Sequence, residues 1–463
     1  MTSRRQFLIS AGAVTVGFSG LAAAVARGVR HSGSDATVDG YGPLQRDSRG
    51  MLDLPHGFRY HAFSRAGEPM DDGLLVPGDH DGMAAFAGPN GKTILVRNHE
   101  LFVPETNKSP FGADRRLLDK VPPERVYDLG HATNALCIGG TTTLVYDTKL
   151  QQLNRHFLSL AGTVNNCAGG PTPWNTWLTC EETTVRADEN FTKDHGYVFE
   201  VPADAESGLI EPRPIKAMGR FRHEAVCVDP KSGIVYLTED TADGLIYRFI
   251  PNKPGDMHAG GRLQALAVRG RKSLDTRNWS FFREVGLNTK LPCAWVDLDE
   301  IDSPNNDLRF QGADRGAAIF ARGEGMWFGR ETVFFACTKG GWEEAGQIWK
   351  YTPSPGEGTA REESAPGALE LFIEPNDRGL IDNADTLTVA PWGDLVICED
   401  GADTQYLVGA TPEGKLYKLA RNAKGLSEFA GATFSPDGGT LFVNMQYDGI
   451  TFAITGPWNR RRA

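Results

Sequence analysis

The chain has 463 residues, of which 40% are hydrophobic, and this is enough to bury one large core or two ordinary ones. Its formal net charge of -11 argues against a nucleic-acid-binding surface, because binding to phosphates needs clustered lysine and arginine. The 54 glycines and 27 prolines imply many turns, which favours a β-rich fold over a helical one.

The N-terminus has the pattern of an export signal. The sequence SRRQFL (residues 3–8) resembles a twin-arginine motif, and a weakly apolar stretch that ends at Ala24-Val25-Ala26 offers a cleavage site. We expect residues 1–26 to be a signal peptide read by the twin-arginine export machinery, and the protein to be periplasmic or secreted. An uncleaved N-terminal anchor is the alternative. No later segment has the length of a membrane span, so none is expected in the mature protein.

After a polar arm at residues 27–50, the pattern becomes repetitive. Short apolar runs that follow a turn end in an acid or an amide, and a second run with the period-2 alternation of a strand often comes next. The first kind occurs at 93–100, 176–183, 234–241, 332–341, 394–401 and 440–446, and the second at 196–201, 244–249, 346–351 and 414–419.

Six such units predict an all-β fold, a six-bladed β-propeller formed by residues 51–463 as a single domain. A few short helices are expected in loop insertions at 102–125, 251–320 and 353–368. Two β-sandwiches are the alternative, but they give no reason for so many strands to end in a polar residue.

Residues 163–183 combine two kinds of metal ligand. Cys167 precedes the flexible pair Gly169-Gly170, and a short apolar strand then delivers Glu181 and Glu182. The seven cysteines have no disulfide-framework spacing and no C-x-x-C motif. A thiolate and carboxylates brought together suggest a metal centre, and a core cysteine beside a solvated loop is the alternative.

In a propeller the strand tips surround the axis, so distant residues meet there. Like charges at close range repel strongly, and bound cations on the axis would relieve this repulsion. Oxygen ligands suit Ca²⁺, and a thiolate beside carboxylates suits zinc more obviously than ferric iron. The residues placed there are Asn98, His99, Glu100, Cys167, Glu181, Glu182, Glu224, Glu239, Asp240, Arg322, Glu324, Asp382, Asn383, Asp385, Glu399, Asp400, Asn444 and Gln446.

At these residues the sequence resembles the PhoX-type alkaline phosphatase family over roughly residues 50–450. The most specific part is the run from Asn166 to Glu182, which contains NCAGG, TPW and LTCEE. The resemblance also rests on the export motif, Asn98-His99-Glu100, His223-Glu224-Ala225, Arg322-Gly323-Glu324-Gly325, Asp385-Thr386-Leu387 and Phe434-Ser435-Pro436-Asp437-Gly438. It implies a six-bladed propeller with ferric iron and calcium on its axis that hydrolyses phosphoesters.

The resemblance also implies residue roles. Cys167 would bind iron through its thiolate, Arg322 would face the substrate phosphate, and Glu324 would serve both catalysis and metal binding. The other implied metal ligands are Glu182, Glu224, Asp385, Glu100 and Asn98. The chain departs from the family pattern at Asn175, where a glycine is usual, and at Thr386, where an asparagine is usual.

The expected function is therefore a metal-dependent phosphatase that acts on small phosphorylated substrates, and a monomer is expected. Two alternatives remain open from the sequence. A calcium-dependent propeller lactonase would have no use for Cys167 as a ligand. A non-catalytic metal-binding propeller would have no turnover. The sequence holds no G-x-S-x-G elbow and no P-loop.

Overall fold

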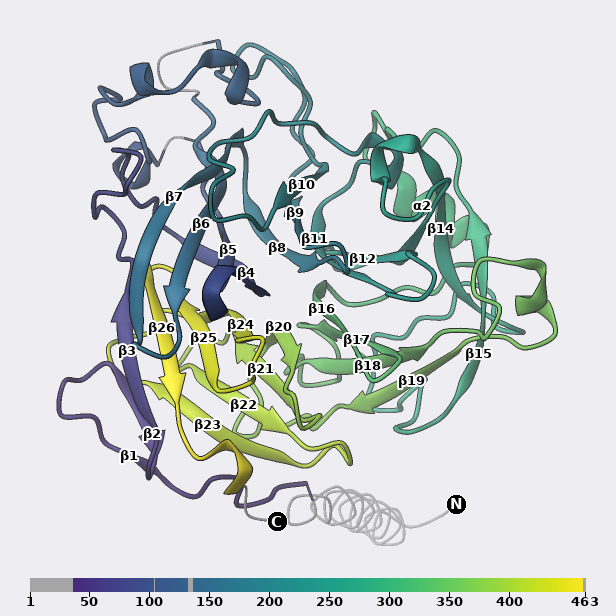
Figure 1. Cartoon of the computed structure of the whole chain (residues 1–463). Coiled ribbons are helices and arrows are strands. Elements are labelled where there is room, and N and C mark those ends of the chain that lie inside the picture. Colours follow the sequence, from purple (N-terminus) through teal and green to yellow (C-terminus); the bar gives the residue numbers. More distant parts are fainter. Residues whose placement is uncertain (1–35, 104, 132–135, 461–463) are drawn as a thin grey trace, which may run out of the picture.

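The computed structural model describes residues 36–103, 105–131 and 136–460, so the expected signal peptide lies outside the described residues. In this part of the chain the fold is all-β with one α-helix, α2 (Leu308–Asp314), which lies in the insertion expected at 251–320 (Figure 1). The strands are β1 (Leu44–Gln45), β2 (Leu52–Pro55), β3 (Arg59–Phe63), β4 (His80–Ala87), β5 (Thr93–His99), β6 (Gly139–Asp147), β7 (Gln152–Thr163), β8 (Asn166–Pro171), β9 (Thr176–Glu181), β10 (Val198–Pro202), β11 (His223–Val228), β12 (Val235–Glu239), β13 (Ile246–Pro251), β14 (Gly261–Val268), β15 (Leu291–Asp297), β16 (Gly323–Gly329), β17 (Thr332–Cys337), β18 (Gln347–Thr352), β19 (Ala368–Ile373), β20 (Ala384–Val389), β21 (Leu395–Glu399), β22 (Tyr406–Ala410), β23 (Leu416–Asn422), β24 (Phe429–Phe434), β25 (Thr440–Met445) and β26 (Ile450–Thr455).

The strands form antiparallel sheets in a β-propeller-like arrangement (Figure 1). Four sheets have the orders β4-β5-β6-β7, β8-β9-β10, β24-β25-β26-β3 and β20-β21-β22-β23-β2-β1. The fifth contains two antiparallel runs, β11 to β14 and β16 to β19, which β15 joins by pairing with both β14 and β19.

The N-terminal part of the chain is built into two of these sheets. Strand β3 pairs with β26, so a segment from early in the chain completes the sheet made by its end. Strand β2 pairs with β23, and β1 pairs with β2. The described part of the segment expected to be an arm, residues 36–50, therefore packs on a sheet, and Thr37 bridges Leu416.

All six predicted apolar runs with polar tips form strands, namely β5, β9, β12, β17, β21 and β25. We had expected these six strands to be the innermost of their sheets, and this expectation was wrong. A further strand precedes each of them, and these six inner strands (β4, β8, β11, β16, β20 and β24) contact one another in a closed ring.

Each inner strand is interrupted by a bulge near its start. The pairing of β4 with β5, for example, jumps from His80 to Met83, so Asp81 and Gly82 lie in the bulge. The same shift occurs in the other five pairings, β8–β9, β11–β12, β16–β17, β20–β21 and β24–β25. A bulge re-aims the side chains beside it, which is why bulges concentrate at functional sites.

The inner strands are packed so closely that the second residue of each bulge must be small. A Cβ atom added to Gly82 would lie 2.6 Å from the Cα atom of Ala168, and one added to Gly325 would lie 2.5 Å from the Cα atom of Thr386. Backbone atoms would have to move to admit such a methyl group.

Replacing Gly325 with alanine should therefore displace Asp385, whose carbonyl oxygen would lie 2.9 Å from the new Cβ atom. We expect a loss of about 1–3 kcal/mol of stability, and weaker metal binding because Asp385 is one of the ligands expected from the sequence. Thermal denaturation and metal analysis measure the two effects. The matched control is Gly425→Ala, because a Cβ atom there meets nothing within 4 Å.

Candidate metal centre

The bulges and the strand tips bring ligand-type side chains together at one end of the ring. The first bulge residues of five inner strands are Asp81, Cys167, Glu224, Glu324 and Asp385, and the sixth strand has Gly431 in this place. The residues that directly follow the next strand of each sheet are Glu100, Glu182, Asp240, Thr338, Asp400 and Gln446.

Seven of these side chains form what we call the central cluster, which consists of linked groups whose ligand atoms lie within 4.8 Å of one another. Glu224 belongs to two groups, one with Cys167 and Glu182 and the other with Glu324 and Asp385. Cys167 also belongs to a third group with Asp81 and Glu100. The Cys167 Sγ atom lies 3.0 Å from Glu224 Oε1. Six of the seven residues proposed from the sequence as metal ligands therefore meet in space.

The seventh, Asn98, does not join the central cluster and instead bonds to the backbone of the strand that carries Cys167. Its Nδ2 group donates to the backbone oxygens of Cys167 (3.0 Å) and Ala168 (2.7 Å), and its Oδ1 accepts from Trp177 Nε1 at 2.8 Å. These bonds use both ends of the amide to hold the strand that carries Cys167. His99 likewise points away, bonding to Gly78 O and Thr142 Oγ1.

The two neighbouring acids at a strand tip point in different directions, because successive side chains of a strand lie on opposite faces. Glu182 and Asp240 face the centre, whereas the preceding residues serve the surrounding loops. Glu239 accepts from Tyr247 Oη at 2.6 Å, and Glu399 is paired with Lys418 Nζ at 2.8 Å. Only one acid of each pair is therefore available to the central cluster.

Amide side chains fix the carboxylates of the central cluster. Asn165 Nδ2 donates to Glu182 Oε2 at 2.9 Å. Gln446 Nε2 donates to Asp81 Oδ2 at 2.8 Å and to Glu100 Oε2 at 2.6 Å. Asp81 and Asn165 were missed in the sequence. The signal for Asp81 was its place before Gly82 and an apolar run, as Glu224 stands before Ala225.

Two arginines lie at the edge of the central cluster. Arg322 forms a bidentate pair with Asp240, at 2.6 Å from Nε and 2.7 Å from Nη2, and its Nη2 is 3.0 Å from Glu324 Oε1. Arg222, which the sequence did not single out, bonds to Glu182 and lies 3.8 Å from Asp240 Oδ2. The side chains of Arg322 and Arg222 remain 33% and 43% exposed, so both can be reached from solvent.

The backbone at Arg322 has an uncommon conformation. It has a φ of 56°, a left-handed conformation that is uncommon outside glycine, and Asn165 and Asn383 enter their inner strands in the same conformation. Asparagine adopts this region more readily than other residues. Asp79, with a φ of 39°, precedes inner strand β4 in a left-handed conformation too, so this backbone turn recurs at the entry to four inner strands.

The central cluster holds more negative charge than the protein alone can neutralise. Burial, followed by the charge of Glu324, raises the pKa of Glu224 well above its usual range. Burial, followed by Asp400, raises the pKa of Asp385 to about 8, and burial raises that of Glu100 to about 7. The pKa of the Cys167 thiol is also raised, by burial and then by Glu224.

These residues fit a bound cation. Glu224 Oε2 is fully buried and has no hydrogen-bond partner in the described structure, although a buried carboxylate oxygen without a partner is costly. A positive ion at this place would satisfy that oxygen and bring the raised pKa values back down.

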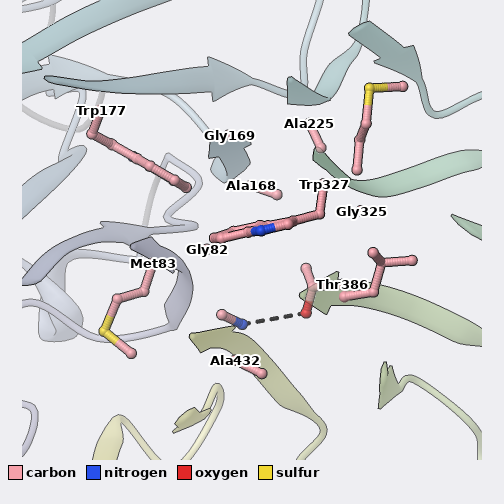
Figure 2. A pocket seen from close by; sticks show the side chains of 13 residues that line it. Gly82, Met83, Ala168, Gly169, Trp177, Ala225, Gly325, Trp327, Thr386 and Ala432 are labelled. Carbon is pink, nitrogen blue, oxygen red and sulfur yellow. Dashed lines mark hydrogen bonds between the residues drawn. The ribbon is translucent and has the colours of Figure 1, made fainter. Parts of the chain in front are cut away.

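A narrow pocket lies at the bulges of the inner strands (Figure 2). The second bulge residues line it, and these are Gly82, Ala168, Ala225, Gly325, Thr386 and Ala432. The indole ring of Trp327 lies across the middle of the view in Figure 2, with Trp177 and Met83 nearby. Thr386 Oγ1 accepts from the backbone N–H of Gly431 at 3.3 Å. The residue that replaces the expected asparagine thus helps to close the ring.

None of the helices in the described ranges is long and apolar enough to cross a bilayer.

No curated protein matches the chain. Among solved structures, it is similar to Pseudomonas fluorescens PhoX in complex with vanadate, a transition state analogue, with 18% identity and a TM-score of 0.64 over 89% of this chain and 97% of that one. It is also similar to a Xanthomonas campestris gluconolactonase, with 13% identity and a TM-score of 0.42 over 90% of this chain and 98% of that one.

The likeness to PhoX shows a shared fold. The family described as alkaline phosphatase PhoX matches residues 39–449, a range that contains every residue of the central cluster. The chain belongs to the PhoX family of alkaline phosphatases.

Proposed function

We propose that the protein hydrolyses phosphoesters at the central cluster, with metal ions held on the axis of a six-bladed propeller. The observation that carries the proposal is the position of Glu224. Its carboxylate belongs to two ligand groups at once, lies against the Cys167 thiol and has a buried oxygen without a partner.

The closed ring of six inner strands supports the blade number. Five sheets supply these strands, and the nine-stranded sheet supplies two of them, β11 and β16. This sheet therefore counts as two blades that β15 joins at their outer edges. In this arrangement the bulges of five blades would each direct one ligand side chain toward the axis, and the sixth blade has Gly431 at that position.

Ferric iron and Ca²⁺ are the metals we propose. Iron follows from the resemblance to the PhoX family: Cys167 would bind it with its thiolate, and Glu182 and Glu224 would be ligands beside it. Asp81, Glu100, Glu324 and Asp385 offer the hard oxygen donors that calcium prefers. Asn98 would hold the Cys167 strand in place. When bound, the ions would polarise the phosphoryl oxygens and activate an oxygen nucleophile.

The protein's own contribution is to orient the phosphate. Asp240 occupies Nε and Nη2 of Arg322 and so fixes the plane of the guanidinium group, which leaves Nη1 as a donor for a phosphoryl oxygen. Arg222 adds a second positive charge at the same edge. Both groups would stabilise negative charge that develops on the phosphoryl oxygens in the transition state.

Replacing Arg322 with alanine should lower kcat/KM about 10²- to 10³-fold, the usual cost of losing one oriented donor to a developing anion. Arg322→Lys keeps the charge and loses the fork, so it should recover only part of the activity. The matched control is Arg277→Ala, because Arg277 makes the same bidentate pair with Asp275 (2.8 and 2.6 Å) away from the central cluster. Steady-state kinetics with p-nitrophenyl phosphate measures both effects.

The proposed function is tested by elemental analysis of protein exported through its own leader, with turnover of p-nitrophenyl phosphate assayed on the same sample. Iron, calcium and turnover are expected together, and Cys167→Ser should abolish turnover. Cys293→Ser is the matched control, because the Cys293 thiol donates to Leu291 O and a hydroxyl can do the same. Calcium without iron, and no phosphate release, would contradict the proposal.

We also propose that residues 1–26 direct export, that the mature protein is periplasmic or secreted as a monomer, and that residues 51–463 form one propeller domain. The packing of residues 36–50 on β2 and β23 supports a domain boundary earlier than residue 51, so that this segment belongs to the domain. The family match, which begins at residue 39, agrees with this earlier boundary.

A further inference from the structure

A second group of potential metal ligands lies outside the central cluster. Asp128, Cys137 and His195 are fully buried, and their ligand atoms lie within 4.8 Å of one another. We call this group the loop cluster, because all three residues lie in segments without regular strands, between β5 and β6 or between β9 and β10. Glu181, the neighbour of Glu182, contacts it through His195.

The hydrogen bonds around Glu181 determine which nitrogen of His195 carries a proton. Glu181 accepts from the backbone N–H groups of Val164 (3.0 Å), Gly196 (2.9 Å) and Tyr197 (3.2 Å), and its Oε1 lies 2.6 Å from His195 Nδ1. Since this carboxylate only accepts, Nδ1 must donate to it. A carboxylate that accepts from the far nitrogen of a histidine is the usual partner of a histidine that binds a metal.

Three electron-rich atoms then face one another on the other side of the ring. His195 Nε2 lies 3.3 Å from Asp128 Oδ2 and 3.9 Å from Cys137 Sγ. A hydrogen or a metal ion must lie among them, and the hydrogen can be a proton on Nε2 or that of the Cys137 thiol. A charge-assisted N–H to carboxylate bond is usually about 2.7–2.9 Å, so 3.3 Å is long for a proton.

The His195–Asp128 separation of 3.3 Å matches an edge of a tetrahedral zinc site, and the His195–Cys137 separation of 3.9 Å is somewhat wider than one. Zinc binds nitrogen and oxygen at about 2.0–2.2 Å and sulfur at about 2.3 Å, which sets ligand-to-ligand edges of about 3.3 Å for N–O and about 3.6 Å for N–S. The donor set of one nitrogen, one sulfur and one oxygen is also that of zinc. Three protein donors leave the fourth position to a solvent molecule.

The Asp128 carboxylate is oriented as a ligand should be. It accepts from the backbone N–H groups of Gly130 (2.7 Å), Thr192 (2.8 Å) and Lys193 (3.0 Å), and from Thr192 Oγ1 (2.6 Å). Such bonds hold a ligating carboxylate in place and tie the segment around residue 128 to the one around residue 193. We propose that Asp128, Cys137 and His195 bind a divalent transition-metal ion of the zinc type, which joins these two loops behind the central cluster.

The test is a count of zinc per chain in variants that separate the two sites. Purified wild-type protein should hold one zinc ion in addition to any metal of the central cluster, and Cys167→Ser should keep it. Cys137→Ser should lose it, and Cys293→Ser should not. The readout is metal content, so the result does not depend on phosphatase activity or on the proposed function.

Cobalt substitution gives a second readout that does not require a loop-cluster variant to fold. Cys167→Ser protein loaded with Co²⁺ should show a near-ultraviolet thiolate-to-cobalt band, because Cys137 is then the thiol at a metal site. Zinc absent from wild-type protein, no such band, or zinc retained in Cys137→Ser would each overturn the proposal. In that case a hydrogen, on His195 Nε2 or on the Cys137 thiol, takes the place of the metal ion.

Discussion

Replacing Glu224 with glutamine is expected to lower kcat about a thousandfold or more and to release metal from the central cluster. Glu224 stands at the junction of two ligand groups, so the substitution weakens both at once. The amide keeps the size of the side chain but loses the charge that binds a cation, and it leaves an N–H₂ group against Cys167. A thousandfold loss corresponds to about 4 kcal/mol of transition-state stabilisation, a magnitude typical of metal-ion catalysis.

Glu239→Gln is the matched control for this prediction. Glu239 is as deeply buried as Glu224, and burial raises its pKa to about 7, but it accepts from Tyr247 Oη and the Leu245 N–H instead of facing the centre. The control should keep both metal and turnover. Equal losses in the two variants would mean that a buried carboxylate matters here for folding and not for its place in the central cluster.

The sequence predicted those strands whose apolar residues are clearly bounded by turn residues. Runs such as 332–341 and 394–401 have an unbroken apolar centre, 333–337 and 395–398, and all six runs formed strands as expected. The inner strands were missed because small residues dominate them, as in β8 (Asn166–Pro171), which reads NCAGGP. These residues are required by the close approach of neighbouring strands, a constraint that acts between distant parts of the chain.

The residues of the candidate site could be predicted where a local sequence rule fixes the direction of a side chain. They could not be predicted where a β-bulge fixes that direction. Period-2 alternation separates Glu182 from Glu181, and Asp240 from Glu239. The position of Asp81 depends on a bulge whose pairing partner, β5, lies beyond a turn, and its place before an apolar run was the one local signal for it. The loop cluster was missed for a similar reason, because Asp128 and His195 are far apart in sequence and follow no metal-binding spacing.

Removing the metal should reverse the pH dependence of stability. In chelated protein, burial holds the pKa of Asp385 at about 8 and that of Glu100 at about 7, against about 4 in an unfolded chain. Between pH 4 and 8 the folded protein therefore binds more protons than the unfolded chain. The free energy of unfolding then falls as the pH rises through this window, and these groups contribute their full stability only at its acidic end.

Metal-loaded protein should behave in the opposite way across the same window, because the ligands must lose their protons to bind an ion, so metal affinity rises with pH. The difference in Tm between loaded and chelated samples should widen steadily from pH 5 to pH 8 in calorimetric scans. Asp385→Asn removes one of the titrating groups, so its chelated form should lose less stability over this range than chelated wild type. Parallel Tm curves for loaded and chelated wild type would show that the buried carboxylates of the central cluster are ionised without a cation, and the metal centre would then lose its electrostatic basis.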